Sequence, residues 1–175
     1  MEHKLHLYTG DGKGKTTAAM GLALRALGHG QRVLVVQFMK DGRSGELKSL
    51  AQLPGAQVYP GKPVVGFTFT MTPDELEQAK AEQTRQALDV AALIERTKPQ
   101  TVILDELGQA VISGMVEEAA ARRLLAAAVS CAETVTTGYS APQWLHDMSD
   151  YVSVISAEKH PYTTEGLQAR EGVEW

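Results

Sequence analysis

The chain has 175 residues, of which 43% are hydrophobic, and its formal net charge is −4. This length suits one α/β domain spanning residues 1–175 and is too short for two domains of ordinary size. The negative balance argues against a nucleic-acid surface that works by general basicity, although a local basic pocket is compatible with it. With Cys131 as the only cysteine, no internal disulfide forms. We find neither an apolar leader nor a run of about 18 apolar residues, so we expect a cytoplasmic protein without a membrane partner.

Short apolar segments alternate with segments of helical periodicity along the chain. The apolar segments predict strands at residues 5–9, 33–38, 56–59, 101–104, 133–137 and 151–155. The periodic segments predict helices at residues 15–27, 44–52, 73–96, 116–130 and 141–148. This alternation indicates the α/β class, with a mostly parallel sheet and helices on both faces. The longest predicted loop is the Gly- and Pro-rich segment 54–71.

A glycine-rich loop directly follows the first predicted strand and opens the first predicted helix. It comprises Gly10, Asp11, Gly12, Lys13, Gly14, Lys15, Thr16 and Thr17. Such a loop surrounds phosphate oxygens with backbone N–H groups, while its lysine contacts phosphate and its threonine binds Mg²⁺. The usual pattern has glycine where this chain has Thr9, but the strand–loop–helix context favours a phosphate-binding loop (P-loop). A basic glycine turn without a ligand is the alternative.

Two carboxylates, Asp105 and Glu106, follow the predicted strand at residues 101–104. An acidic side chain at the carboxyl end of a strand beside a P-loop can hold Mg²⁺ directly or through water. Asp105 is therefore our candidate metal-side acid, together with the Thr16 hydroxyl. Glu106 is its alternative, or else a partner to it or a general base. The sequence alone does not separate the two.

Three more polar candidates, Gln37, Lys40 and Arg43, come at or after the end of the second predicted strand. In an open parallel sheet, ligands bind outside the carboxyl ends of the strands. Here the two cations would meet phosphates or a carboxylate on a second substrate. A solvated basic loop is the alternative, because exposed charges often contribute nothing measurable.

Taken in order, the segments of this chain resemble one known family. YTGDGKGKTTAAMGLALRALGHG is followed by VLVVQFMKDGRSGELKSL, GFTF, VILDEL, a TTG turn and the C-terminal KHPYTTEGLQAREGVEW. This series is similar to the P-loop type of ATP:corrinoid adenosyltransferase, the CobA/CobO/BtuR family. The resemblance covers almost the whole chain.

The resemblance implies a RecA-like P-loop fold and an enzyme that transfers the 5′-deoxyadenosyl group of ATP to a Co(I) corrinoid, releasing triphosphate, in adenosylcobalamin biosynthesis or salvage. It implies ATP, Mg²⁺ and a corrinoid as ligands, a homodimer, and an electron-donating reductase as a candidate partner. Because Co(I) is itself a strong nucleophile, the protein needs to orient C5′, stabilise the leaving group and exclude water. Lys15 and Glu106 are then the catalytic candidates, Phe67 and Phe69 in segment 54–71 contact the corrin, and Arg170 reaches a phosphate.

The chain also departs from the family pattern. Phe69 stands where the family commonly has Trp, Tyr139 stands where Arg is common, and Glu171 follows Arg170 where a more apolar or basic pair is usual. Two alternatives therefore stay open. One is a P-loop ATPase or small-molecule kinase, in which Glu106 orients water or deprotonates an acceptor. The other is a divergent paralogue that binds nucleotide or corrinoid without catalysis.

Overall fold

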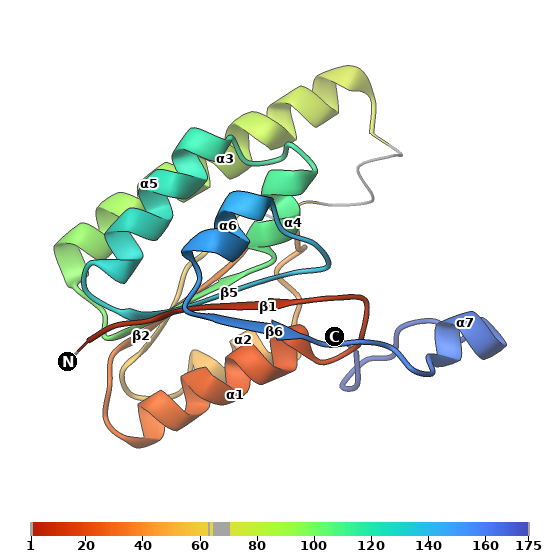
Figure 1. The fold of residues 1–175 in the computed structure, drawn as a ribbon, viewed down its shortest axis with the longest axis horizontal. Coiled ribbons are helices and arrows are strands. Elements are labelled where there is room, and N and C mark those ends of the chain that lie inside the picture. Colours follow the sequence, from red (N-terminus) through yellow and green to blue (C-terminus); the bar gives the residue numbers. More distant parts are fainter. Residues whose placement is uncertain (1, 63, 65–70, 175) are drawn as a thin grey trace.

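The computed structural model describes residues 2–62, 64 and 71–174. A six-stranded sheet with strand order β3-β2-β4-β5-β1-β6 lies at its centre (Figure 1). Its strands are β1 (Leu5–Thr9), β2 (Val33–Gln37), β3 (Ala56–Val58), β4 (Thr101–Asp105), β5 (Glu133–Gly138) and β6 (Tyr151–Val154). All neighbouring strands in this sheet pair in parallel. The predicted α/β class is confirmed, and the sheet is parallel throughout.

Helices cover both faces of the sheet, as predicted. They are α1 (Lys15–Gly28), α2 (Gly45–Leu50), α3 (Pro73–Thr97), α4 (Leu107–Ile112), α5 (Glu118–Val129), α6 (Gln143–Met148) and α7 (Pro161–Glu165). Helices α1 and α2 lie on one face, α3 to α6 on the other, and α7 projects beyond the sheet (Figure 1). The sequence did not predict α4 or α7, whose six and five residues span less than two helical turns. The six-residue helices α2 and α6 were predicted only as parts of longer segments, 44–52 and 141–148. Among the described residues, no helix has the length and apolarity to cross a bilayer.

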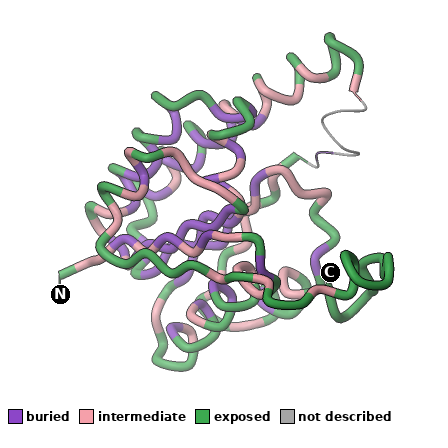
Figure 2. The backbone as a smooth tube through the Cα atoms, turned by 45° about the vertical axis from the view of Figure 1, so that its right-hand side comes forward, coloured by how far each residue is buried: buried purple, intermediate pink, exposed green. Residues whose placement is uncertain are grey.

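The central strands bury side chains on both faces of the sheet. In β2, Leu34 and Val36 belong to the core formed with α3 and α5, whereas Val33 and Val35 belong to the core formed with α1. This two-sided burial explains why the strand is a continuous apolar run instead of an alternating one. Figure 2 shows the buried residues concentrated in the sheet and on the inward sides of the helices, while the C-terminal segment is exposed.

Helix α3 begins at the residue that the sequence predicts. The Thr72 hydroxyl accepts a hydrogen bond from the Glu75 backbone N–H, and the Glu75 carboxylate accepts one from the Thr72 N–H at 2.8 Å. Pro73 occupies the first turn, where its missing N–H costs nothing. This capping box fixes the start of the longest helix of the described chain.

One loop lies where the connections of two neighbouring strands leave in opposite directions. From β1 the chain crosses to β2, beyond β5 and β4, whereas from the neighbouring β5 it crosses β1 in the other direction to reach β6. The loop after β1 therefore lies at the topological switch point, where ligands bind in open α/β sheets. The register pairs Gln37 of β2 with Asp105 of β4, so both strands end at this edge.

Candidate functional site

Close backbone approach and positive φ angles account for the glycines of the loop after β1. Gly10 has φ 112° and Gly14 has φ 117°, values that favour glycine. A Cβ atom at Gly10 would collide with the Ile155 carbonyl oxygen, and one at Gly12 would lie 2.8 Å from that oxygen. The Gly12 N–H instead donates to the Ile155 carbonyl at 2.8 Å. The segment that follows β6 thus holds the loop in place directly before α1.

Lys15, the first residue of α1, folds back over this loop. Its Nζ donates to the carbonyl oxygens of Gly10 at 2.6 Å and Gly12 at 2.7 Å. The ammonium also lies 6.0 Å from the centroid of the Tyr139 ring. An aromatic ring therefore lies beside the loop lysine at the position where the family resemblance leads us to expect a second cation.

The Asp105 carboxylate, at the end of β4, is the centre of a polar cluster. Its side chain is fully buried. Oδ1 accepts hydrogen bonds from the hydroxyls of Thr16 at 2.9 Å and Thr137 at 2.8 Å. Oδ2 accepts from Gln37 Nε2 at 3.0 Å and Lys40 Nζ at 2.7 Å. Of the two candidate acids, Asp105 is thus the one in contact with Thr16.

Glu106 directly follows Asp105 in the chain and lines the cavity beside the loop. Its φ of 62° turns the chain between β4 and α4, and its backbone N–H donates to the Thr137 hydroxyl at 2.9 Å. Burial, and secondarily the charge of Asp105, raise the pKa of the Glu106 carboxyl, while Lys40 and Lys15 oppose the rise. A carboxyl with a raised pKa suits proton transfer nearer neutral pH.

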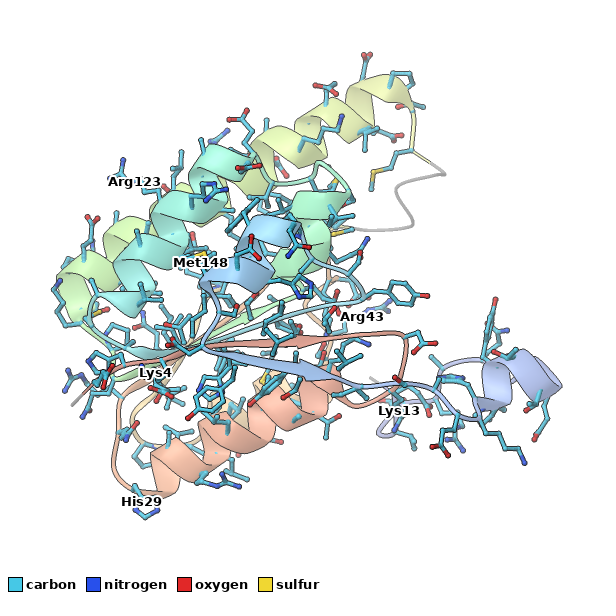
Figure 3. All side chains as sticks on the ribbon, viewed as in Figure 1. Lys4, Lys13, His29, Arg43, Arg123 and Met148 are labelled. Atoms are coloured by element: carbon cyan, nitrogen blue, oxygen red, sulfur yellow. The ribbon has the colours of Figure 1, made fainter. Side chains whose placement is uncertain are left out.

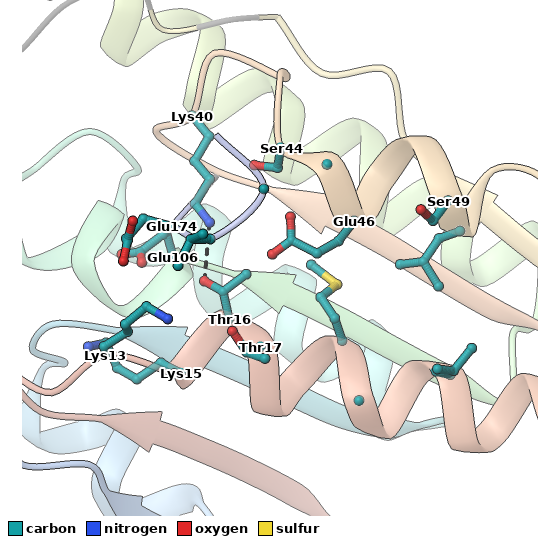
Figure 4. A pocket seen from close by; sticks show the side chains of 18 of the residues that line it. Lys13, Lys15, Thr16, Thr17, Lys40, Ser44, Glu46, Ser49, Glu106 and Glu174 are labelled. Atoms are coloured by element: carbon teal, nitrogen blue, oxygen red, sulfur yellow. Dashed lines mark hydrogen bonds between the residues drawn. The ribbon is translucent and has the colours of Figure 1, made fainter. Parts of the chain in front are cut away.

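A cavity of about 750 Å³ opens beside the loop, between α1, α2 and the C-terminal segment (Figure 4). Its polar end is formed by Lys13, Lys15, Thr16, Lys40 and Glu106. Its other end is apolar and is lined by Met20 and Leu24 of α1 and by Leu50 and Leu53 in and after α2. Cavities of about 300–1,000 Å³ with few polar groups are typical small-molecule sites. This one combines a cationic, amide-rich end with an apolar end.

Comparison with known proteins identifies the family. The family model of the ATP:corrinoid adenosyltransferases BtuR/CobO/CobP matches residues 2–175. The chain belongs to this family. It is 33% identical over 174 residues to a corrinoid adenosyltransferase of Pseudomonas aeruginosa, covering 98% of this chain and 83% of the relative. It is 28% identical to one from Escherichia coli K12, covering 97% and 84%.

Membership of the ATP:corrinoid adenosyltransferase family confirms the resemblance and places the chain among transferase enzymes. A solved structure of AMPPCP-bound DnaA from Aquifex aeolicus has a TM-score of 0.45 and 13% identity, over 98% of this chain and 48% of that one.

The structure of this family member brings together most of the predicted site residues, but not all of them. The predicted residues that converge at the carboxyl edge of the sheet are 10–17, Gln37, Lys40, Asp105 and Glu106. Arg43, predicted to face a phosphate or second substrate, has a 74% exposed side chain whose Nε donates to Asp41 at 2.7 Å. Figure 3 shows Lys13 and Arg43 on the side of the molecule away from Lys4 and His29.

The remaining predicted site residues lie in the C-terminal tail, in the loop after β1 and in segment 54–71. Arg170 pairs with Glu174 at 3.0 Å, and residues 172–174 of this turn line the cavity. The guanidinium thus fixes the tail turn, and the phosphate contact that the resemblance implies for Arg170 stays a prediction. Asp11 accepts a hydrogen bond from the Ala157 N–H at 3.1 Å, which ties the loop to the segment after β6. Phe67 and Phe69 lie outside the described residues.

Sequence reasoning missed three parts of the site. They are the Thr137 hydroxyl, the start of α2 with Ser44 and Glu46, and the tail at residues 172–174. A polar residue at the carboxyl end of a buried strand is a signal that could have found Thr137. The tail could not be found that way, because its position depends on how the chain after β6 returns to the sheet.

Proposed function

We propose that this protein transfers the 5′-deoxyadenosyl group of ATP to a Co(I) corrinoid and releases triphosphate. Family membership supports the reaction class. The observation that carries the proposal is the convergence of Lys15, Thr16 and Asp105 on a P-loop that opens into a cavity of about 750 Å³. Such a loop binds polyphosphate through backbone N–H groups, and its cavity has the size of a small-molecule site.

The reaction makes one bond and breaks one bond at the same carbon. The Co(I) substrate supplies an electron pair to C5′, the Co–C bond forms, and the C5′–O bond breaks with its electron pair leaving on triphosphate; cobalt is formally oxidised to Co(III). The chain needs no Ser, Cys or His nucleophile, because the Co(I) substrate is itself the nucleophile. The tasks of the protein are positioning and stabilisation of the leaving charge, for which Lys15 and the loop amides are suited.

The residues present fit a magnesium ion. Mg²⁺ prefers oxygen ligands, and the Thr16 hydroxyl and Asp105 carboxylate are oxygen donors 2.9 Å apart at the edge of the phosphate-binding loop. When bound there, Mg²⁺ would neutralise charge on the phosphates. Lys15 and the loop amides would also hold the triphosphate.

The family resemblance also supports proposals for the corrin contacts, a further phosphate contact and the assembly. Phe67 and Phe69 of segment 54–71 would contact the corrin, and Arg170 would reach a phosphate after leaving Glu174. We also propose a cytoplasmic homodimer that uses an electron-donating reductase as partner.

The direct test combines the protein with ATP, Mg²⁺ and chemically reduced cobalamin. We expect a light-sensitive Co–C bond in the absorption spectrum and one triphosphate per bond formed. Lys15→Ala should lower the rate about a hundredfold or more, because it removes one electrostatic donor to the leaving group. Lys48→Ala, an exposed charge change on α2, is the matched control. Production of ADP and phosphate in place of triphosphate would contradict the proposal.

One observation favours a second candidate, a P-loop ATPase or small-molecule kinase. Glu106 lines the cavity with a raised pKa, which suits a residue that orients water or deprotonates an acceptor. Corrinoid-independent ATP turnover that Glu106→Gln removes would support this function. Tight binding of both ligands without product would instead indicate a non-catalytic paralogue.

A further inference from the structure

A lysine occupies the position that the proposed function gives to a divalent cation. Lys40 Nζ lies 2.7 Å from Asp105 Oδ2 and 3.1 Å from Thr16 Oγ1. Figure 4 shows its side chain reaching across the cavity to the Thr16 hydroxyl. These are the same two side chains that would bind Mg²⁺. One ammonium and one metal ion cannot share this space.

We propose that Lys40 is an exchangeable internal counter-cation. It neutralises Asp105 until nucleotide and divalent cation arrive together, and its ammonium then moves to the phosphates. The inference rests on the proposed nucleotide site and extends it, because it assigns Lys40 a positioning role. Free divalent cation would compete poorly with a tethered ammonium, whereas nucleotide offers that ammonium another anion.

Asp105 needs a cation for electrostatic reasons. Its carboxylate is fully buried, and a buried charge without a partner is strongly unfavourable. Gln37, Thr16 and Thr137 donate hydrogen bonds to it but bring no net charge. Lys40 Nζ, 2.7 Å from Asp105 Oδ2, brings the positive charge that these three groups lack. Removal of Lys40 would therefore leave an uncompensated anion that attracts a metal ion.

The side chain of Lys40 can move while its backbone stays in place. The preceding Met39 has φ 55°, and its N–H donates to Gln83 Oε1 at 3.0 Å. The Lys40 carbonyl accepts a hydrogen bond from the Val64 N–H at 3.0 Å. Gln83 is buried on α3, so the turn is anchored to the core. The flexible four-carbon stem, which is 25% exposed, is left to carry the ammonium between anions.

This exchange makes metal and nucleotide binding interdependent. Nucleotide would draw Lys40 away from Asp105 and raise the affinity for the metal, and by reciprocity the metal would raise the affinity for nucleotide by the same factor. Without Lys40, the metal would bind the free protein, and nucleotide would add less to its affinity.

The test measures Mn²⁺ binding by electron paramagnetic resonance, with and without a non-hydrolysable ATP analogue, at pH 8. Wild type should bind Mn²⁺ weakly alone and much more tightly with the analogue. Lys40→Met should bind Mn²⁺ without nucleotide about tenfold more tightly than wild type, because a competing charge is gone. The ratio of the two Mn²⁺ affinities should fall correspondingly. Lys48→Met, an equal charge change on the exposed side of α2, should leave both affinities unchanged.

Lys40→Arg and Lys40→Gln complete the series. The arginine variant keeps a cation and should bind Mn²⁺ alone as weakly as wild type, whereas the glutamine variant should behave like Lys40→Met. A folded Lys40→Met or Lys40→Gln protein, judged by circular dichroism, that binds free Mn²⁺ no more tightly than wild type would overturn the inference. Failure of the proposed function appears separately, as a wild type that binds no metal–nucleotide complex or forms no Co–C bond.

Discussion

At the scale of single residues, Asp105 is the side chain on which the polar cluster depends. All the side-chain groups that contact it, from Thr16, Gln37, Lys40 and Thr137, are hydrogen-bond donors. Asp105→Asn would present an amide NH₂ to donors and would leave Lys40 without its anion. We expect the free energy of unfolding to fall by about 2–3 kcal/mol. Urea denaturation measures it.

Asp147→Asn is the control for this change. Asp147 is exposed on α6 and accepts a hydrogen bond from Gln143 Nε2 at 2.8 Å. Its substitution should change the free energy of unfolding by less than about 0.5 kcal/mol. Equal stability of the two variants would show that the cluster does not stabilise the fold.

We expect ionisation of Glu106 to make the free energy of unfolding depend on pH. Because burial and Asp105 raise its pKa above the ordinary value of 4.5, the folded protein binds this proton more tightly than the unfolded chain does. The free energy of unfolding should therefore decrease as pH rises from 4.5 through the raised folded pKa. Glu106→Gln removes this dependence, so the variant should gain stability relative to wild type across that interval and hold the gain above it. Urea denaturation at a series of pH values tests the sign, and a gap that narrows with rising pH would contradict it.

At the scale of elements, alanine should have opposite effects on stability at two glycines of the β1–loop–α1 unit. A side chain at Gly10 would collide with the Ile155 carbonyl at φ 112°, whereas one at Gly21, inside α1, would meet nothing within 4 Å. Gly10→Ala should therefore lower the free energy of unfolding by about 2 kcal/mol or more, through strain and forced movement of the loop. Gly21→Ala should raise it by about 0.5–1 kcal/mol, because alanine is the better helix former.

The two alanine variants are each other's control, since the chemical change is the same. Urea denaturation gives both free energies, and titration with a fluorescent ATP analogue should show that Gly10→Ala loses binding. A neutral Gly10→Ala would mean that the loop does not need its close approach to the segment after β6.

At the scale of the whole molecule, the sequence was sufficient for the class of fold and for the central part of the site. Short continuous apolar runs such as 101–104 are typical of strands buried on both faces, and parallel strands gather their carboxyl ends at one edge. The choice between Asp105 and Glu106 required the structure, because it depends on the left-handed turn at Glu106. The place of residues 172–174 required it too, since a tail with little buried surface leaves no periodic pattern.

Ligand binding should stabilise the whole molecule most when ATP and Mg²⁺ are bound together. A ligand present at about 100 times its Kd adds about 2.7 kcal/mol to the free energy of unfolding, which for a domain of this size raises Tm by about 5–10 °C. We expect this shift for ATP with Mg²⁺, a smaller one for ATP alone, and almost none for Mg²⁺ alone, because Lys40 already satisfies Asp105. In Lys15→Ala the combined shift should shrink, because the loop loses its phosphate-binding cation. Differential scanning calorimetry distinguishes these cases, and a rise in Tm with Mg²⁺ alone as large as that with both ligands would show that the metal site is open before nucleotide binds.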